Sequence, residues 1–382
     1  MRALILLPQT YADGGIQRFN RTFLAACERL EMQCDVLSLN DSEAGAARWP
    51  RPANATVRVF QHDRIRFSAA VARAVWSGSH DAVLIGHINL LVLTVSILSL
   101  RWMRRPRSLL VTHGVEVWQG IGGLRRRALG CVDRILSVSE FTRGSIRAQA
   151  PELGEERVVV FPNALSESWV AAEGDSLREL PVQQPCSGRF ILSVARLDRH
   201  DRRKGVVTTI EALAMLADRD VHYVVAGGGD DMDFLKTVAA RCGVGARVHF
   251  LGAVSDYMLA GLYRHCAAFV LPSGQEGFGI VFLEAMYFGA PVIAAREKGA
   301  TEVVRDGETG LLVRYGDVVG LAAAIDRLLA DDPLRARLRE AALGTVVGEG
   351  RFTFQSFTKR CAEAFGTRRR DPLPASGHSS HG

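Results

Sequence analysis

The sequence predicts an α/β protein of two domains, each a parallel β-sheet covered by helices. Short apolar runs alternate with longer segments of helical periodicity along most of the 382 residues. This alternation is typical of parallel strands joined by crossover helices. A single hydrophobic core rarely grows beyond about 250–300 residues, so a chain of this length is expected to divide into two domains.

In the first domain, placed at residues 1–180, short apolar runs predict buried strands at 3–7, 34–39, 82–85, 108–111, 134–138 and 158–161. A helix beginning near Gly15 carries Phe19, Phe23 and Cys27 at helical spacing. Residues 174–189 contain two prolines and lack periodicity, which is typical of a linker.

A second series follows, and it defines a domain at residues 188–350. Strands are expected at 190–194, 221–226, 248–251, 268–271, 292–294 and 311–313, and helices at 206–217, 232–242, 257–265 and 280–288. The phenylalanine-rich segment 351–366 is expected to form a C-terminal helix. The polar tail 367–382 is expected to be disordered.

The apolar stretch 83–100 is long enough to resemble a membrane span, but it contains His87 and Asn89. A strand, a short loop and a buried helix over 89–100 explain it better. The N-terminal apolar run stops at Pro8, so it predicts a strand and not a secretory signal. Seven scattered cysteines without a C-x-x-C pair are expected to be reduced thiols, and we predict a cytoplasmic protein.

The net charge of +6 is unevenly distributed. Basic clusters follow the apolar stretch, and such clusters attract anionic lipid headgroups or phosphates: Arg101, Arg104, Arg105 and Arg107, then Arg125, Arg126 and Arg127. A solvated face is the alternative. Nucleic acid is not expected as a partner, because aromatic residues do not interleave with the basic ones. Peripheral contact with the inner face of an anionic membrane is therefore an expectation.

The strongest chemical signal is the segment PSGQEGFGIVFLEAM at residues 272–286. A strand ends at Leu271, a glycine-rich loop carries Glu276, and a helix begins near Gly279. The first N–H groups of a helix lack intrahelical partners and lie at its positive end, which suits a phosphate. Glu284 lies about 7 Å further along the same helix. Two carboxylates would then flank a nucleotide-sugar diphosphate.

Carboxylates alone would repel a diphosphate, so cations are needed nearby. Arg196 and Lys204 follow the first strand of the second domain, at the carboxyl end where α/β sheets bind ligands. A planar guanidinium and an ammonium together suit a pyrophosphate leaving group. A solvated arginine-rich loop is the alternative for these residues taken alone. No metal-ligand spacing is visible, and His62, His80, His87 and His265 receive no role.

With these residues the chain resembles the retaining glycosyltransferases of family GT4, which have the GT-B fold of two Rossmann-like domains facing across a cleft. Glu276 and Glu284 match the family's E-x7-E motif, and Arg196 and Lys204 match its basic pair. Weaker landmarks appear in the expected order along nearly the whole chain: Gly14-Gly15, Thr112-His113-Gly114, Val138-Ser139-Glu140, Pro162-Asn163-Ala164, Gly227-Gly228-Gly229 and Phe250-Leu251-Gly252.

The resemblance implies roles for these residues. Arg196 and Lys204 would bind the donor diphosphate, Glu284 the ribose and Glu276 the donor sugar. The N–H groups of Gly279 and Ile280 would contact phosphate, the Gly14-Gly15 loop would close over it, and His113 would meet the sugar near the reacting carbon. Catalytic roles thus fall to His113, Glu276, Arg196 and Lys204. The resemblance also implies retention of the anomeric configuration, no cofactor and no metal.

Two departures and several alternatives accompany this interpretation. Ala300 stands where the family often has the second glycine of a pair, and residues 198–204 are unusually charged. We expect a hexosyltransferase with a glycan or lipid-linked acceptor, favouring GDP-mannose as donor, although UDP-sugar enzymes share the main motifs. A UDP-sugar epimerase of the same shape is an alternative, and a non-catalytic nucleotide- or glycan-binding protein is another.

Overall fold

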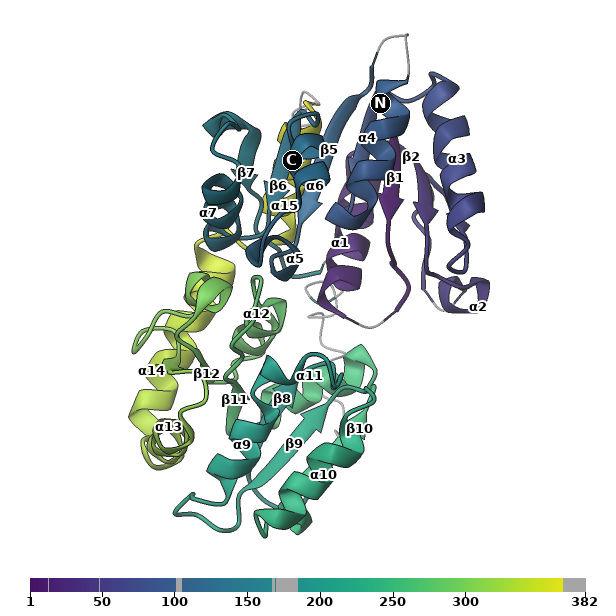
Figure 1. Ribbon diagram of the computed structural model, residues 1–382. Coiled ribbons are helices and arrows are strands. Elements are labelled where there is room, and N and C mark those ends of the chain that lie inside the picture. The colour runs from purple at the N-terminus through teal and green to yellow at the C-terminus, as the bar shows by residue number, and fades with distance from the viewer. Residues whose placement is uncertain (13, 48, 101–104, 167–168, 170–184, 367–382) are drawn as a thin grey trace, which may run out of the picture.

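The computed structural model describes residues 1–12, 14–47, 49–100, 105–166, 169 and 185–366. The described chain forms two lobes, each built on a parallel sheet (Figure 1). The N-terminal sheet has seven strands in the order β3-β2-β1-β4-β5-β6-β7, and the C-terminal sheet has six in the order β10-β9-β8-β11-β12-β13. The predicted fold class, α/β with two Rossmann-like domains, is therefore confirmed.

The central strands of the N-terminal sheet are buried on both faces, which explains why their sequences are continuous apolar runs. The strands are β1 Arg2–Leu7, β2 Gln33–Ser38, β3 Ala55–Val59, β4 Ala82–Ile85, β5 Arg107–Thr112, β6 Arg134–Ser137 and β7 Val158–Val160. The connecting helices are α1 Gly15–Arg29, α2 Glu43–Ala46, α3 Arg64–Trp76, η1 Ile88–Leu90, α4 Leu91–Ser99, α5 Val115–Trp118, α6 Gly123–Leu129, α7 Glu140–Gln149 and η2 Glu155–Arg157.

The C-terminal domain repeats this plan with shorter strands. Its strands are β8 Phe190–Val194, β9 His222–Ala226, β10 Val248–Gly252, β11 Ala268–Leu271, β12 Val292–Ala295 and β13 Leu311–Val313. Its helices are η3 Arg202–Lys204, α9 Val206–Leu213, α10 Met232–Arg241, η4 Gly245–Arg247, α11 Asp256–His265, α12 Ile280–Tyr287, η5 Lys298–Glu302, α13 Val318–Ala330, α14 Asp332–Leu343 and η6 Gly344–Gly348.

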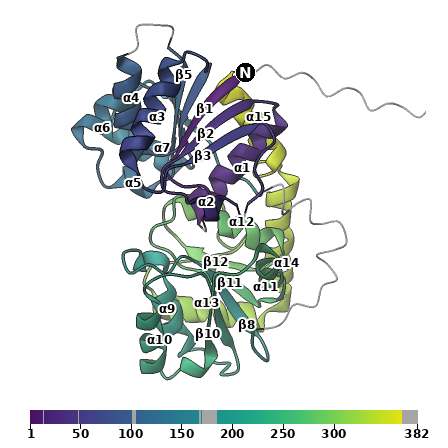
Figure 2. The same ribbon diagram turned by 90° about the vertical axis from the view of Figure 1, so that its right-hand side faces the viewer.

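The last helix, α15 (Phe354–Phe365), returns to the N-terminal domain, where Figure 2 shows it beside α1. Its side chain Phe357 is fully buried and its ring lies 5.7 Å from Phe19 and 5.0 Å from Phe161, centroid to centroid. The chain therefore crosses between the lobes twice, and α15 completes the core around Phe19 and Phe161.

In both sheets the strand order reverses at an equivalent strand. In the N-terminal sheet β1 is flanked by β2 and β4, and in the C-terminal sheet β8 is flanked by β9 and β11. Ligands of open α/β sheets bind beyond the carboxyl ends of the strands at such a switch point. The loops after β8 and β11 carry Arg196, Lys204 and Glu276, so the topology directs these residues to one place.

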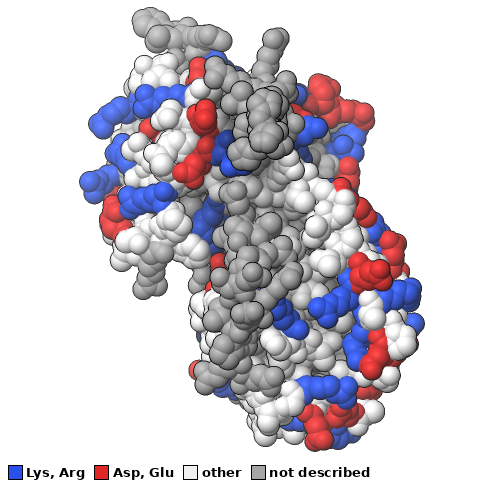
Figure 3. Space-filling model, turned by 180° about the vertical axis from the view of Figure 1, so that it is seen from behind, with Lys and Arg blue, Asp and Glu red and all other residues white. Residues whose placement is uncertain are grey.

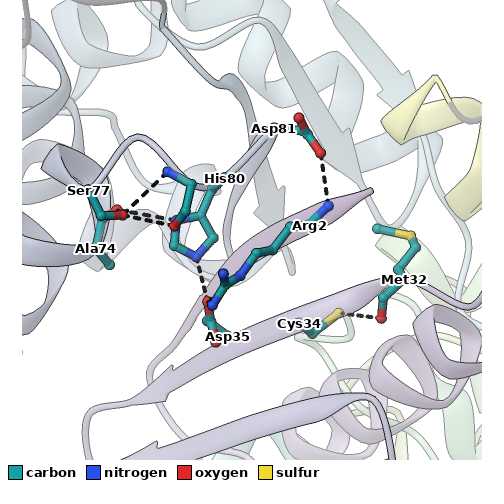
Figure 4. A network of polar contacts seen from close by, with 9 residues as sticks. Arg2, Met32, Cys34, Asp35, Ala74, Ser77, His80 and Asp81 are labelled. Atoms are coloured by element: carbon teal, nitrogen blue, oxygen red, sulfur yellow. Dashed lines mark hydrogen bonds and ion pairs between the residues drawn. The ribbon is translucent and has the colours of Figure 1, made fainter.

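The opposite, amino-terminal edge of the first sheet is held by a polar network (Figure 4). Asp35 on β2 accepts hydrogen bonds from Arg2 Nε at 3.0 Å and from His80 Nε2 at 2.7 Å. Asp81 accepts the Arg2 N–H at 2.9 Å. These contacts join the beginnings of β1, β2 and β4 and leave the carboxyl ends to the functional loops.

Charged side chains of both signs are interspersed on the face seen in Figure 3, over the residues coloured there. No helix among the described residues is both long and apolar enough to span a bilayer. The stretch 83–100 folds as β4, η1 and α4, which confirms the expected strand, loop and helix. Arg101 and Arg104 and the tail 367–382 lie outside the described residues, as does most of the expected linker.

Replacing Phe357 by Ala should destabilise the protein by about 3–5 kcal/mol, because the truncation leaves a cavity among Phe19, Phe23 and Phe161. Urea unfolding monitored by tryptophan fluorescence measures the loss. Lys359→Ala, on the exposed side of the same helix, is the matched control and should change stability by less than about 0.5 kcal/mol. Equal effects of the two substitutions would contradict the packing role of α15.

Candidate functional site

The loop between β11 and α12 supplies the centre of the site. Gly279 precedes α12 with φ of 89°, a left-handed conformation that residues with a Cβ rarely adopt. This conformation lets the chain turn sharply from the loop into the helix, so that α12 begins at the carboxyl end of β11. Both ribbon views place α12 at the boundary between the lobes (Figures 1 and 2). The sequence-predicted Gly279 and Ile280 therefore begin a helix at the domain junction.

Lys204 and Glu276 are in direct contact. Lys204 Nζ lies 3.2 Å from Glu276 Oε2, and the Gly274 N–H donates a hydrogen bond of 2.8 Å to the Arg203 carbonyl, so the two loops are joined by backbone as well. Burial opposes the charge on Lys204, but Glu276 and Asp201 outweigh it and raise the pKa of the ammonium. A charged ammonium is thus held at the end of the C-terminal sheet.

Arg196 also follows β8, and its positive charge opposes the protonation of Lys204. Its own side chain is more than half exposed, and its Nε lies 2.8 Å from Asp198 Oδ2. The unusually charged segment 198–204 is largely paired within the domain: Arg202 contacts Asp231 at 2.7 Å. Of the two predicted cations, Lys204 contacts Glu276 directly, whereas Arg196 contacts Asp198 in this structure.

His113 is brought to Glu276 by a close approach of two backbones. A Cβ on Gly277 would lie 2.0 Å from the His113 carbonyl oxygen, and one on Gly114 would lie 2.8 Å from the Gly277 Cα. Only residues without side chains can meet in this way. The loop after β5 in the N-terminal domain therefore touches the Glu276 loop of the C-terminal domain.

The His113 imidazole is buried and oriented. Its Nε2 lies 2.9 Å from the Gly86 carbonyl, so this nitrogen carries the proton, and its ring packs against the edge of Phe19 at 5.1 Å. Burial lowers the pKa of His113 although Glu116 opposes this effect. The His87 ring stacks 6.0 Å away, and burial lowers its pKa to about 4. The site thus presents neutral imidazoles at neutral pH.

Glu284 has partners that sequence reasoning did not anticipate. Its Oε1 lies 2.6 Å from Arg18 Nη1 of α1, and its Oε2 accepts a hydrogen bond of 3.0 Å from the Tyr263 hydroxyl. Arg18 also contacts Asp256 at 2.9 Å. The residues Arg18 and Glu284 lie 266 positions apart in the chain. The predicted ribose carboxylate is therefore held in an ion pair between the domains in this structure.

Gly14 and Gly15 lie at the start of the same helix that carries Arg18. Gly14 is the N-cap of α1, with φ of 145°, and Gly15 is its first residue. One turn later Arg18 reaches Glu284, so the N-terminus of α1 faces the C-terminal domain. The position of Arg18 three residues after Gly15 was the signal in the sequence that could have marked Arg18 as part of the site. Its partner Glu284 became visible only in the tertiary structure.

The remaining contacts fasten the junction. The Phe141 N–H donates to Glu302 Oε1 at 2.9 Å, and Lys298 Nζ lies 4.7 Å from the centre of the Trp118 ring. Gly299, at the departure from the family's glycine pair, donates its N–H to the Glu276 carbonyl at 3.1 Å. In the described part of the chain, the group of His, Cys, Asp or Glu side chains able to share an ion lies elsewhere, at the amino ends of β9 and β10.

Two family models match the chain. The one described as Glycosyl transferases group 1 covers residues 182–344, and the one described as Glycosyltransferase Family 4 covers residues 13–168. Together they span both lobes and every loop described above. With these matches, and with 32% identity to a Family 4 relative over 77% of the chain, the chain belongs to the group 1 glycosyl transferases of Family 4, and its two lobes have the GT-B fold.

Individual relatives agree. The chain is 32% identical to a phosphatidyl-myo-inositol mannosyltransferase of Mycolicibacterium smegmatis over 77% of this chain and 73% of that protein. It is 35% identical to the lipopolysaccharide core biosynthesis glycosyltransferase LpsE of Rhizobium meliloti over 53% of this chain, and the match spans 57% of the length of LpsE. The structure of Anabaena HepE in complex with UDP-glucose has the same fold, with a TM-score of 0.78, 21% identity and coverage of 96% and 100%.

Replacing Arg18 by Met should destabilise the protein more at pH 8 than at pH 5. Burial already raises the pKa of Glu284, and Arg18 is the charge that opposes this rise. Without Arg18 the pKa of Glu284 in the folded protein rises further above its value in the unfolded chain. The variant then keeps its stability while Glu284 is protonated at low pH, and loses it as the pH rises through the folded-state pKa of Glu284. We expect a loss of about 3–5 kcal/mol at pH 8, the typical result of leaving a buried charge unpaired.

Chemical denaturation of wild type and variant at both pH values measures this difference. Because acid affects every carboxylate, the quantity compared is the deficit of the variant relative to wild type at each pH. Adding Glu284→Gln to the Arg18→Met variant should remove the pH dependence of the deficit. An equal deficit at pH 5 and pH 8 would show that the ion pair does not control the charge of Glu284.

Proposed function

We propose that the chain is a retaining hexosyltransferase that needs neither metal nor cofactor and transfers a sugar from a nucleotide-diphosphate donor to a glycan or lipid-linked acceptor. The observation that carries this proposal is the contact of Lys204 with Glu276 at 3.2 Å beside the start of α12. A fixed ammonium, a guanidinium and helix N–H groups near one point can stabilise a departing diphosphate without a metal ion. The resemblance to the retaining enzymes supports the stereochemistry.

In this mechanism the bond between the anomeric carbon and the diphosphate oxygen breaks as the acceptor oxygen bonds to the same face of that carbon. The acceptor proton passes to the departing phosphate oxygen. Lys204 and Arg196 neutralise the charge that develops on the diphosphate. Glu276 gives up its contact with Lys204 to bind donor-sugar hydroxyls. His113, neutral and oriented through Gly86, places a polar nitrogen near the sugar.

The Arg18–Glu284 pair suggests how the ribose is bound. The ribose diol would replace Arg18 or join it as a partner of Glu284, while the Tyr263 hydroxyl keeps the carboxylate oriented. Since Arg18 comes from the other lobe, donor binding at Glu284 would change the contact between the domains. Donor binding and domain arrangement are then coupled through one side chain.

For the sugar and acceptor, the relatives give direction. A phosphatidyl-myo-inositol mannosyltransferase and a lipopolysaccharide core glycosyltransferase are among the similar proteins, and they support mannose as the sugar and a glycolipid as the acceptor. The structural neighbour in complex with UDP-glucose supports UDP-sugars as the alternative donors. A screen of GDP- and UDP-sugars by thermal shift, with and without EDTA, tests both the base and metal independence. Product analysis with and without acceptor separates transfer from epimerisation.

Lys204→Met should reduce transfer about 10²–10³-fold, because it removes a cation that stabilises the leaving diphosphate. Glu276→Gln should reduce turnover while nucleotide binding is retained. Initial rates with a radiolabelled donor and calorimetric binding of the nucleotide measure the two effects. Lys236→Met, an exposed lysine on α10, is the control and should leave both unchanged. Full activity of Lys204→Met would refute the proposed donor site.

A membrane contact through the N-terminal domain is proposed to bring the enzyme to its acceptor, at the inner face of the membrane. Helices α4 and α6 pack side by side. Leu100, the C-cap of α4, is 74% exposed, and Leu124 in α6 is 72% exposed, with Arg126 and Arg127 following in the same helix. Apolar side chains beside basic ones suit an anionic lipid surface.

Leu124→Asp combined with Arg127→Gln should weaken binding to vesicles containing anionic lipid at least about fivefold, since each basic residue near such a surface contributes about 1 kcal/mol. Co-sedimentation with anionic and with neutral vesicles at low salt measures it. The control is Leu343→Asp, an exposed leucine of the C-terminal domain. Unchanged sedimentation of the double variant would exclude this surface.

A further inference from the structure

Three potential metal ligands meet at the edge of the C-terminal sheet remote from the donor loops. Cys186 lies just before β8, His222 is the first residue of β9, and His249 is the second residue of β10. Their ligand atoms all lie within 4.8 Å of one another, and each residue is partly buried. The donor loops follow the carboxyl ends of β8 and β11, whereas this cluster lies at the amino ends of the strands.

The sheet itself sets the positions of the two histidines. In the parallel pairing of β9 and β10, His249 is the partner of Val224, which lies two residues after His222. Residues two apart in a strand point to the same face, so both imidazoles project from one face of adjacent strands. Cys186 packs on the apolar cluster that includes Val224 and Phe190, which places it at this same face.

The distances are close to those of a zinc site. His222 Nδ1 and His249 Nε2 lie 2.8 Å apart, and the ring centroids are 5.0 Å apart. Two imidazole nitrogens on a tetrahedral zinc ion would be separated by about 3.3 Å, given zinc–nitrogen bonds of about 2.0–2.1 Å. A side-chain adjustment of about half an ångström would therefore admit the ion between them.

A hydrogen bond shared by two histidines is the simpler explanation, but it leaves the nearby thiol without a part. A thiolate together with two imidazoles is a soft donor set, which selects zinc over magnesium or calcium.

We propose that Cys186, His222 and His249 form a binding site for a divalent zinc ion, with a fourth position open to solvent. The ion would fasten the chain entering β8 to the beginnings of β9 and β10. The site is independent of the proposed transferase chemistry and has no part in it. Its expected effect is on the stability of the C-terminal domain.

The test uses the full chain, reduced and stripped of metal with a chelator. Titration with Zn²⁺ against a chromophoric chelator should show one tightly bound ion per chain, and Co²⁺ should produce a sulfur-to-cobalt charge-transfer band. Zn²⁺ should also raise the thermal unfolding midpoint. Cys186→Ser and His249→Gln should each weaken Zn²⁺ binding more than about tenfold, and Cys186→Ser should abolish the charge-transfer band.

Two controls make the result specific. Cys242→Ser removes another partly buried thiol of the same domain and should change none of these signals. A His378→Asn, His381→Asn variant removes the tail histidines and should bind Zn²⁺ like wild type. The absence of tight Zn²⁺ binding by wild type, or unchanged binding by Cys186→Ser, would overturn the proposal. Nucleotide binding should be the same in Cys186→Ser and wild type.

Discussion

The meeting of two backbones at Gly277 and His113 is the constraint on which the rest of the site depends. A Cβ at Gly277 would lie 2.0 Å from the His113 carbonyl, so this contact exists only because the loop has no side chain there. It places the end of β5 in one lobe against the loop after β11 in the other. The buried imidazole and the Glu276 carboxylate belong to different domains, and this contact makes them parts of one site.

Two ion pairs neutralise the carboxylates near the junction. Lys204 and Glu276 pair within the C-terminal domain, whereas Glu284 pairs with Arg18 from the N-terminal domain. Each carboxylate that the family pattern assigns to the donor is thus neutralised by a protein cation in this structure. Under the proposed function, a donor bound at these carboxylates would exchange these partners for its own hydroxyl groups.

Sequence reasoning located the strands that form the centres of both sheets, because buried parallel strands are continuous apolar runs. It missed β3, an edge strand in which intermediate and exposed residues alternate, since such a strand lacks that signal. It also missed α13 and α14, although Asp317 and Asp331 cap them as typical N-cap residues. These elements lie at the periphery, where tertiary packing determines structure more than the local pattern does.

The sequence by itself determined the fold class, the family and the identity of Arg196, Lys204, Glu276 and Glu284 as candidates, because motif spacing and apolar periodicity are local properties of the chain. Only the tertiary structure decided what these residues contact. The Arg18–Glu284 pair joins positions 266 apart, and the cluster of Cys186, His222 and His249 forms because strand register brings distant residues to one face. Contacts between distant segments depend on how the sheets and lobes pack, and the spacing of residues along the chain does not determine this packing.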